Sequence, residues 1–365
     1  MTKTSFLGSN PFWVSLQIKA TGGLCNLGCR YCINRNSREL TFMSDDVLKA
    51  TVQKALYHNR DMAVFCWFGG EPTLARQGFY EKAVAYQKEY SSPSARIVNQ
   101  IQTNGTLITL ELATFFRENS FGVGVSIDGP EEIHNKMRVI KSGRGSYHLA
   151  VRGLRLLQDA GVNPSVIVTV SKETLPFARQ VFRHVVELGI RRLSYSPVLD
   201  SAVGEYPSIT NDEWYGYIRQ VFDEWCRLGD PEIEVRELNE VIAWVSQVSE
   251  PCCSSLGTCS HWFLVDHDGD IYPCEKWGKS IKFGNVLTHD FSEIIKNSTH
   301  RRFARLTSYK PEKCQRCRFL SVCNNGCTQM RVIGGEFDIL GLYAFCQQRK
   351  ALFRDVESAF SRAIP

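Results

Sequence analysis

The chain has 365 residues, of which 43% are hydrophobic, so it can bury one large core or two moderate ones. Its net charge of +5 is small for this length and no dense block of Lys and Arg occurs, which argues against nucleic acid or a membrane surface as a partner. The first ten residues lack the apolar core of a signal peptide, and no apolar run approaches the ~20 residues of a membrane span. We therefore expect a cytoplasmic protein.

The first two thirds of the chain alternate short apolar runs with longer helical patterns. Such alternation predicts βαβ units and a parallel sheet, here an α/β partial (β/α)6 barrel that is TIM-like but open on one side. In such a barrel the chemistry lies on loops at the carboxyl ends of the strands. The expected strands are 13–19, 63–68, 97–102, 122–127, 165–170 and 192–196. The expected helices are 45–58, 79–90, 110–119, 147–160 and 175–188, with N-caps at Ser44 and Thr109 and C-terminal glycines at Gly161 and Gly189.

The last third of the chain has a different composition, because most of the 14 cysteines lie there. Its expected elements are a helix over 211–228, a linker over 229–234, a hairpin from 262–266 and 270–272 around His267-Asp268-Gly269, and a helix over 347–360. The predicted domains are a partial barrel over 1–235, a cysteine-rich domain over 236–346 and a terminal helix over 347–365.

Three cysteines, Cys25, Cys29 and Cys32, lie together in the loop after the first expected strand. Disulfides are rare in a reducing compartment, so clustered cysteines there indicate metal or redox chemistry. Iron–sulfur clusters usually have four thiolate ligands, so a group of three leaves one iron open for a reactant. A zinc knuckle or three unrelated thiols are the alternatives.

Polar motifs follow the next three expected strands, at the same end of the predicted barrel. Gly69-Gly70-Glu71 follows the second strand, where glycines allow a close backbone approach and Glu71 can accept hydrogen bonds from an ammonium group. The run 102–106, Gln-Thr-Asn-Gly-Thr, ends the third strand. Ser126 ends the fourth, and Arg138 follows it; both can bind a carboxylate. Each motif alone is also compatible with an ordinary turn.

The cysteines of the last third exceed the needs of one tetrahedral zinc site, whereas two four-cysteine clusters would use eight of them. Nine cysteines lie from Cys252 to Cys346, and choosing Cys253 over Cys252 leaves the eight that two clusters need. The eight candidate ligands are Cys253, Cys259, Cys274, Cys314, Cys317, Cys323, Cys327 and Cys346.

The Cys25-x3-Cys29-x2-Cys32 run and the Gly-Gly-Glu-Pro motif resemble the radical S-adenosylmethionine (SAM) enzymes, and the later cysteines resemble the SPASM domain. The resemblance implies three [4Fe–4S] clusters and SAM as cofactors. The resemblance implies that auxiliary cluster I has the ligands Cys253, Cys259, Cys274 and Cys327. It implies that auxiliary cluster II has the ligands Cys314, Cys317, Cys323 and Cys346. The implied SAM contacts are Tyr31, Gly69, Gly70, Glu71, Ser126, Arg138 and Leu199.

Within this superfamily the chain is most similar to the anaerobic sulfatase-maturating enzymes, nearly end to end. Two departures stand out. The maturases carry a catalytic Asp after the third cysteine of auxiliary cluster I, where this chain has Glu275, and they usually carry Phe-Tyr where Ile33-Asn34 stand here. Glu275 is therefore the predicted catalytic base, although its side chain is one methylene longer.

The resemblance implies oxidation of a Cys or Ser side chain in a peptide or protein to formylglycine. A 5′-deoxyadenosyl radical would remove a hydrogen atom from the substrate, Glu275 would take its proton, and an auxiliary cluster would take an electron. Flavodoxin or ferredoxin is the expected electron donor. The alternatives are a relative that crosslinks or otherwise modifies a ribosomally made peptide (a RiPP), and a carrier of clusters or zinc without enzymatic activity.

Overall fold

The structure, a computed structural model, describes residues 14–35, 41–199, 206–245, 253, 257 and 259–363. By its internal contacts the chain divides into two compact units, and each is described by itself. The first unit comprises Met1–Ile127, Glu131–Val166 and His261–Arg301, and the second Asp128–Pro130, Ile167–Ser260 and Arg302–Pro365. The domain limits expected from the sequence, at residues 235 and 346, stay a prediction.

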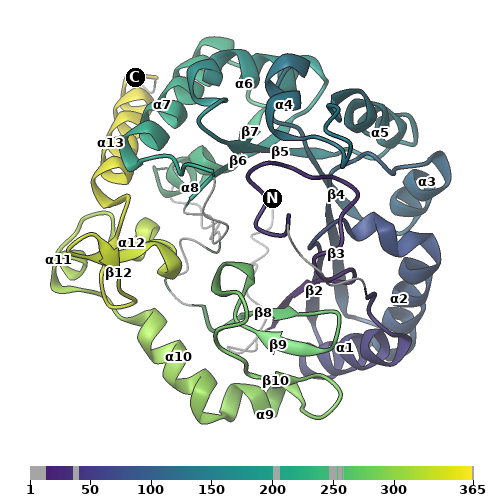
Figure 1. Cartoon of the computed structure of the whole chain (residues 1–365). Helices are drawn as coiled ribbons and strands as arrows, with labels where there is room; N and C mark the ends of the chain where they lie inside the picture. Colours follow the sequence, from purple (N-terminus) through teal and green to yellow (C-terminus); the bar gives the residue numbers. More distant parts are fainter. Residues whose placement is uncertain are drawn as a thin grey trace. The chain divides into compact units, whose positions relative to one another are not determined.

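The first unit contains a mostly parallel sheet with helices on its outer side (Figure 1). Its strands lie in the order β10-β9-β8-β1-β2-β3-β4; those from β8 to β4 run parallel, and β9 and β10 are antiparallel. The strands are β1 (Ser15–Ile18), β2 (Met62–Trp67), β3 (Arg96–Thr103), β4 (Gly122–Ser126), β8 (Trp262–Val265), β9 (Asp270–Tyr272) and β10 (Gly284–Asn285). The helices are α1 (Asp45–His58), α2 (Arg76–Tyr90), α3 (Leu110–Glu118), α4 (Glu131–Met137), α5 (Tyr147–Asp159) and α9 (Phe291–Lys296), with 3-10 turns η1 (Pro72–Ala75) and η4 (Glu275–Trp277).

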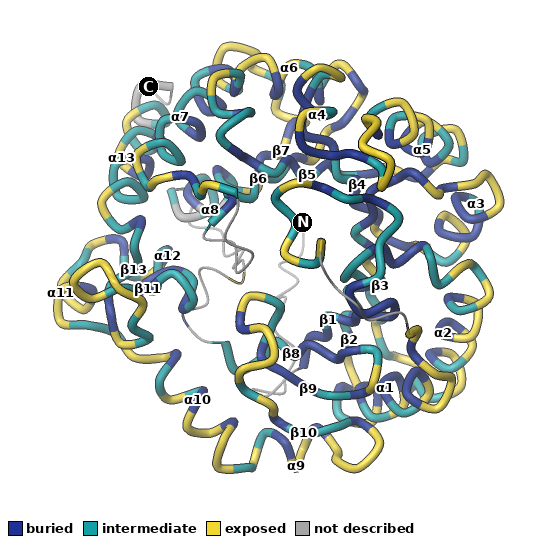
Figure 2. The backbone as a smooth tube through the Cα atoms, in the orientation of Figure 1, coloured by how far each residue is buried: buried dark blue, intermediate teal, exposed yellow. Residues whose placement is uncertain are grey.

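The two sides of this sheet differ in chemistry. Trp67 is fully buried on the side that faces the helices, where its ring meets that of Tyr80 edge-on at 5.7 Å. The register aligns Gln17, Cys66 and Gln100 in one row on the other side. The Cys66 thiol donates to Oε1 of Gln100 at 3.2 Å, and burial raises its pKa to about 12. Figure 2 shows the central strands largely buried. The apolar side holds the core, and the other side carries a row of polar side chains.

The second unit combines the remaining strands of the parallel sheet with the cysteine-rich segment. Strands β5, β6 and β7 are neighbours in this order, and a three-stranded antiparallel sheet has the order β12-β11-β13. The strands are β5 (Ser165–Val170), β6 (Arg192–Pro197), β7 (Glu234–Val235), β11 (Arg331–Ile333), β12 (Glu336–Phe337) and β13 (Leu342–Tyr343). The helices are α6 (Ala178–Glu187), α7 (Asn211–Leu228), α8 (Arg236–Val245), α10 (Ser298–Ser308), α11 (Glu312–Gln315), α12 (Leu320–Cys323) and α13 (Cys346–Ala363), with 3-10 turns η2 (Leu175–Phe177) and η5 (Thr328–Met330).

Most elements expected from the sequence are confirmed within a few residues. Ser44 and Thr109 accept hydrogen bonds from the third residue of their helices, and Gly161 and Gly189 have positive φ angles just past helix ends. The hairpin of β8 and β9 is also confirmed.

One expectation was wrong in detail. The helix expected from residue 175 begins at Ala178, after a 3-10 turn that contains Pro176, because proline disfavours the helical conformation in the preceding residue. The linker expected over 229–234 is confirmed up to residue 233, since Glu234 already belongs to β7 and α8 begins at Arg236. Among the described residues, none of the helices is both long and apolar enough to cross a membrane.

Candidate functional site

The loop that carries Cys25, Cys29 and Cys32 follows β1 and is anchored by its backbone. Gly28 N donates to the carbonyl of Val139 at 2.8 Å, and Arg30 N donates to that of Met137 at 2.9 Å. Cys29 is buried, whereas Cys25 and Cys32 are half-buried. The loop therefore presents three thiols at the carboxyl end of the first strand, as the sequence predicts.

The chemistry of these thiols fits a metal cluster. Burial raises the pKa of Cys25 to about 11, and the negative charges of Glu71 and Cys32 act in the same direction. A thiol in this environment keeps its proton until a metal displaces it. Three thiols in one loop are one fewer than the four ligands of a closed structural zinc site, and they fit a metal cluster that keeps one position open.

The two glycines after β2 allow two loops to touch. Gly70 N donates to the carbonyl of Gly22 at 3.0 Å, and Glu71 N donates to that of Leu24 at 2.7 Å. A Cβ at Gly70 would stand 2.0 Å from the carbonyl oxygen of Leu24, which no side chain tolerates. The sequence suggested close approach to a ligand, whereas the structure shows that Gly70 is required by contact with the cysteine loop.

Glu71 lies beneath these loops and is 1% exposed. Its Oε1 accepts hydrogen bonds from the backbone and hydroxyl of Thr73 and from Oγ1 of Thr103 at 2.6 Å, and its Oε2 accepts from Asn104 N at 2.7 Å. Burial raises the pKa of this carboxyl, and these donors oppose the shift. Four protein donors thus engage Glu71, so it joins the loop after β2 to the loop after β3.

Asn26 and Asn104 link the cysteine loop to the run that ends β3. Asn104 Nδ2 donates to Asn26 Oδ1 at 2.9 Å and lies 3.8 Å from the Cys25 sulfur. Asn26 Nδ2 donates to Thr106 Oγ1 at 2.8 Å. Asn26 was missed in the sequence, although a polar side chain next to the first cysteine was the available signal. The network fixes the position of Cys25.

Tyr31, Ser126 and Arg138 all belong to the first unit. Arg138 is 8% exposed, and its guanidinium lies over the ring of Tyr31 at 5.5 Å. Ser126 is half-buried at the end of β4 and accepts a hydrogen bond from Gln102 Nε2 at 3.0 Å. Leu199 is half-buried but belongs to the second unit. The structure therefore places Tyr31 and Arg138 together.

Glu275, the predicted base, follows β9 and forms an ion pair with Lys19, which follows β1. Lys19 Nζ is 3.2 Å from Oε1 and 3.1 Å from Oε2 of Glu275, and Glu275 N donates to Gln17 Oε1 at 3.3 Å. A Cβ at Gly69 would lie 3.3 Å from the side chain of Lys19. Glu275 is therefore beside the start of the cysteine loop. Sequence reasoning missed Lys19, for which the only signal was a charge at a strand end.

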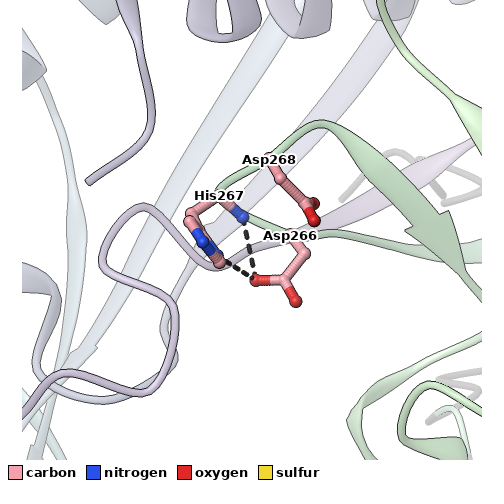
Figure 3. Close-up of side chains that lie close together, drawn as sticks. All are labelled: Asp266, His267 and Asp268. Carbon is pink, nitrogen blue, oxygen red and sulfur yellow. Dashed lines mark hydrogen bonds and ion pairs between the residues drawn. The ribbon is translucent and has the colours of Figure 1, made fainter. Parts of the chain in front are cut away.

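The turn of the β8–β9 hairpin carries a second group of potential ligands, Asp266, His267 and Asp268 (Figure 3). His267 N and Nδ1 both lie within 2.9 Å of Oδ1 of Asp266, and Lys279 Nζ lies 3.1 Å from its other oxygen. These partners and nearby Lys19 lower the pKa of Asp266 against the effect of burial. The group is a charged turn whose one buried carboxylate is already paired.

Four cysteines of the second unit share one pocket. Burial raises the pKa of Cys314, and the charges of Cys323, Cys346 and Cys317 add to that shift, so the four thiols are electrostatic neighbours. The pocket is lined by Cys314, Cys317, Cys323, Cys346, Phe319, Leu320, Asn325, Leu342, Tyr343, Phe353, Lys313, Arg349 and Lys350. Apolar walls with three cations fit a cluster of net negative charge.

The second predicted cysteine set is only partly placed. Cys259 lies 3.0 Å from Oγ1 of Thr328, and its pKa is raised by burial and by the charge of Cys327, so these two cysteines are neighbours. Cys253 is exposed, and Cys274 belongs to the first unit. Cys252 lies outside the described residues.

Comparisons with known proteins agree with this geometry. The radical SAM superfamily matches residues 20–176, and the SPASM iron–sulfur cluster-binding domain matches residues 252–318. A cysteine-type anaerobic sulfatase-maturating enzyme of Clostridium perfringens is 30% identical over 96% of this chain and 97% of its own. A serine-type enzyme of Bacteroides thetaiotaomicron is 27% identical, over 95% and 90%.

A solved structure of anSMEcpe with bound AdoMet and the Cp18Cys peptide resembles this chain over most of its length. It has a TM-score of 0.86 at 29% identity and covers 96% of this chain and 98% of its own. Radical SAM and SPASM domains bind iron–sulfur clusters, and the donor sets described above fit such groups. The chain belongs to the anaerobic sulfatase-maturating enzymes of the radical SAM superfamily.

Proposed function

We propose that this protein oxidises a Cys or Ser side chain of a peptide or protein substrate to formylglycine. The observation that carries the proposal is the position of Glu275, whose carboxylate is held by Lys19 beside the cysteine loop of the first unit. The names of the relatives support it, because they include both cysteine-type and serine-type maturating enzymes. A peptide bound in anSMEcpe supports the substrate class.

The cysteine loop would hold the catalytic cluster through Cys25, Cys29 and Cys32. Asn26 and Asn104 would keep the first of these thiols in place, and Glu71 would hold the two neighbouring loops. Arg138 offers a guanidinium for the carboxylate of SAM, and Tyr31 fixes its orientation. The proposed SAM-contacting set remains Tyr31, Gly69, Gly70, Glu71, Ser126, Arg138 and Leu199.

When bound, the clusters and SAM supply the one-electron chemistry: a 5′-deoxyadenosyl radical that removes a hydrogen atom, and a sink for the electron that leaves the substrate. The protein's own part is proton transfer and positioning. Glu275 accepts the proton of the substrate thiol or hydroxyl, and Lys19 holds its carboxylate toward the strand ends. Loss of one hydrogen atom, one proton and one electron balances the two-electron oxidation to an aldehyde or thioaldehyde, and the latter needs water to release sulfide.

The auxiliary clusters would be bound by the two cysteine sets expected from the resemblance. For cluster II, the shared pocket of Cys314, Cys317, Cys323 and Cys346 supports the assignment. For cluster I, the closeness of Cys259 and Cys327 supports half of the set, which would be completed by Cys253 and Cys274.

A low-potential donor such as flavodoxin or ferredoxin is the proposed source of electrons, since SAM cleavage consumes one electron. We also propose a cytoplasmic location. None of the described cysteines forms a disulfide, which suits a reducing compartment.

The test is anaerobic. Reconstituted protein receives SAM, dithionite and a sulfatase-derived Cys peptide or its Ser variant, and mass spectrometry follows the peptide and 5′-deoxyadenosine. We expect a peptide mass change that matches aldehyde formation, in step with 5′-deoxyadenosine. Abundant 5′-deoxyadenosine with both peptides unchanged would reject the maturase activity and keep the radical SAM chemistry.

A second candidate function is a crosslink or another modification in a ribosomally made peptide. It is favoured by three residues at which this chain departs from the maturases, Glu275, Ile33 and Asn34. Ile33 is 49% exposed, so the loop presents an aliphatic side chain where the maturases carry an aromatic one. This function predicts a short precursor peptide encoded nearby and a new intrapeptide bond. In tandem mass spectrometry, the backbone segment enclosed by that bond would release no separate fragments.

A further inference from the structure

Arg331, the first residue of β11, is a fully buried arginine in the cysteine-rich part of the second unit. Its Nη1 donates to the carbonyls of Thr307 at 2.9 Å and Ile339 at 3.2 Å, and its Nε donates to that of Asn325 at 3.2 Å. A guanidinium with no exposed surface is costly to bury, because it loses its hydration. Carbonyl groups alone replace only part of that hydration.

The charge of Arg331 has no carboxylate partner among the described residues, and its Nη2 is buried without a hydrogen-bond acceptor there. A buried, unpaired cation normally destabilises a fold, because it has lost its hydration and no negative charge compensates for the loss. The buried amino group therefore points to a negative partner that belongs to the working protein.

Two residues that accept hydrogen bonds from Arg331 also contact cysteines, one cysteine from each predicted set. Thr307, whose carbonyl accepts from Arg331, also accepts at its hydroxyl from Cys259 N at 3.3 Å. Asn325, whose carbonyl accepts from Arg331, accepts at Oδ1 from the Cys314 thiol at 3.3 Å. One guanidinium thus joins the segment that holds Cys259 to the segment that holds Cys314.

The electrostatics agree with these contacts. Burial lowers the pKa of Arg331, and the negative charges of Cys259 and Cys327, followed by those of Cys314 and Cys323, oppose that change.

Lys310 interacts electrostatically with Arg331 and with cysteines of both sets. Burial lowers its pKa to about 8, with a further contribution from Arg331, and charges of Cys314, Cys323 and Cys259 act against it. Its Nζ donates to the carbonyl of Gly257 at 2.7 Å. Lys310 is half-buried and therefore more accessible than Arg331.

We propose that Arg331 is a buried counter-charge shared by the two auxiliary-cluster sites, with Lys310 as a second and weaker cation, and that it raises the reduction potentials of both clusters. The proposal rests on the assignment of Cys259 and Cys327 to one cluster and of Cys314 and Cys323 to the other. A nearby positive charge stabilises the reduced, more negative form of a cluster, and hydrogen bonds to its sulfurs act in the same direction.

Arginine suits this role better than lysine, because its guanidinium stays protonated when buried and spreads several donors in a plane. Arg331 is a positioning and tuning residue in this proposal. The competing explanation is purely structural, in which the guanidinium only caps the carbonyls of Thr307, Asn325 and Ile339.

The test is an EPR-monitored redox titration of reconstituted protein with SAM and without peptide, together with iron content. We expect R331M to shift both auxiliary potentials to more negative values, R331K to shift them less, and K310Q to shift them least. R183Q is the matched control. It removes one positive charge from the same unit, and the described partner of that charge is the carboxylate of Glu224.

Unchanged potentials in a folded R331M protein, with iron content like that of the wild type, would overturn the proposal. Should R331M fail to fold, K310Q, which removes the second proposed cation, carries the test, and wild-type potentials in a folded K310Q protein would overturn the proposal equally. Iron for one cluster per chain in the wild type would also overturn it. Because no peptide is present, shifted potentials would support the inference even if the sulfatase peptides proved not to be substrates.

Discussion

The three-thiol loop of the first unit and the four-thiol pocket of the second surround their sulfurs in opposite ways. The loop is held by backbone contacts and by amides such as Asn26 and Asn104. The pocket is walled by apolar side chains such as Phe319 and Phe353. An open ligand position in a polar setting suits a reactant that enters and leaves, whereas four thiolates in an apolar setting suit electron storage.

Glu71 and Glu224, one buried carboxylate from each unit, differ in what surrounds them. Glu71 in the first unit is met by neutral donors, and burial raises its pKa. Glu224 in the second is met by Arg183 and Arg227, whose hydrogen bonds lower its pKa to about 2. The neutral donors let Glu71 join two loops, whereas the ion pairs of Glu224 with Arg183 and Arg227 serve stability.

The largest expected effect separates the two thiol sites. C29A removes a proposed ligand of the three-thiol loop, so 5′-deoxyadenosine should fall below detection. C317A removes a proposed ligand of the four-thiol pocket, so SAM cleavage should persist while peptide oxidation is lost or strongly reduced. Mass spectrometry of nucleoside and peptide in the same sample checks both. Formation of 5′-deoxyadenosine by C29A would break the comparison.

Substitutions of Glu275 test whether the side chains beside the three-thiol loop perform proton transfer. E275Q should lower peptide oxidation by roughly 10²–10⁴-fold, the usual contribution of a general base, with 5′-deoxyadenosine still formed. E275D keeps the carboxylate but moves it by about 1 Å, which can cost ~100-fold. K19M should fall between the wild type and E275Q. A fully active E275Q protein would exclude Glu275 as the base.

A substitution of Gly70 tests the contact between the cysteine loop and the loop after β2. In G70A the new methyl group would stand 2.0 Å from the Leu24 carbonyl, so we expect a loss of about 1–3 kcal/mol and lower iron content. G78A is the control, because nothing lies within 4 Å of a Cβ there and alanine favours helix α2. Chemical denaturation and iron analysis measure both, and a G70A protein as stable as G78A would contradict this packing.

The smallest expected effect concerns acid. The pKa of Glu224 is lowered on folding, so its stabilisation is present above its ordinary pKa of 4.5 and is lost as the pH falls toward 2. E224Q should cost about 1 kcal/mol at neutral pH, a modest value because both arginines are about half exposed, and less below pH 3. Denaturation at both pH values measures it, with the exposed E118Q as control. A pH-independent difference would contradict the ion-pair explanation.

Local signals explain what was predictable. Apolar runs with β-branched and aromatic residues located six of the strands, and Ser44 and Thr109 marked helix starts, because strand burial and capping depend on neighbours in sequence. Strand β7 was not predicted, since it has only two residues and its pairing with β6 depends on a segment about 40 residues earlier in the chain.

The cysteine spacings, the glycine-rich motif and the strand–helix alternation by themselves determined the family, the fold class and the chemistry to look for. Tertiary structure alone decided which side chains meet. Lys19 and Glu275 are 256 residues apart, Asn26 and Asn104 are 78 apart, and Arg331 reaches back 24 residues to Thr307. Such contacts arise because parallel strands bring distant loops to one sheet edge and because buried polar groups must find partners wherever the fold provides them.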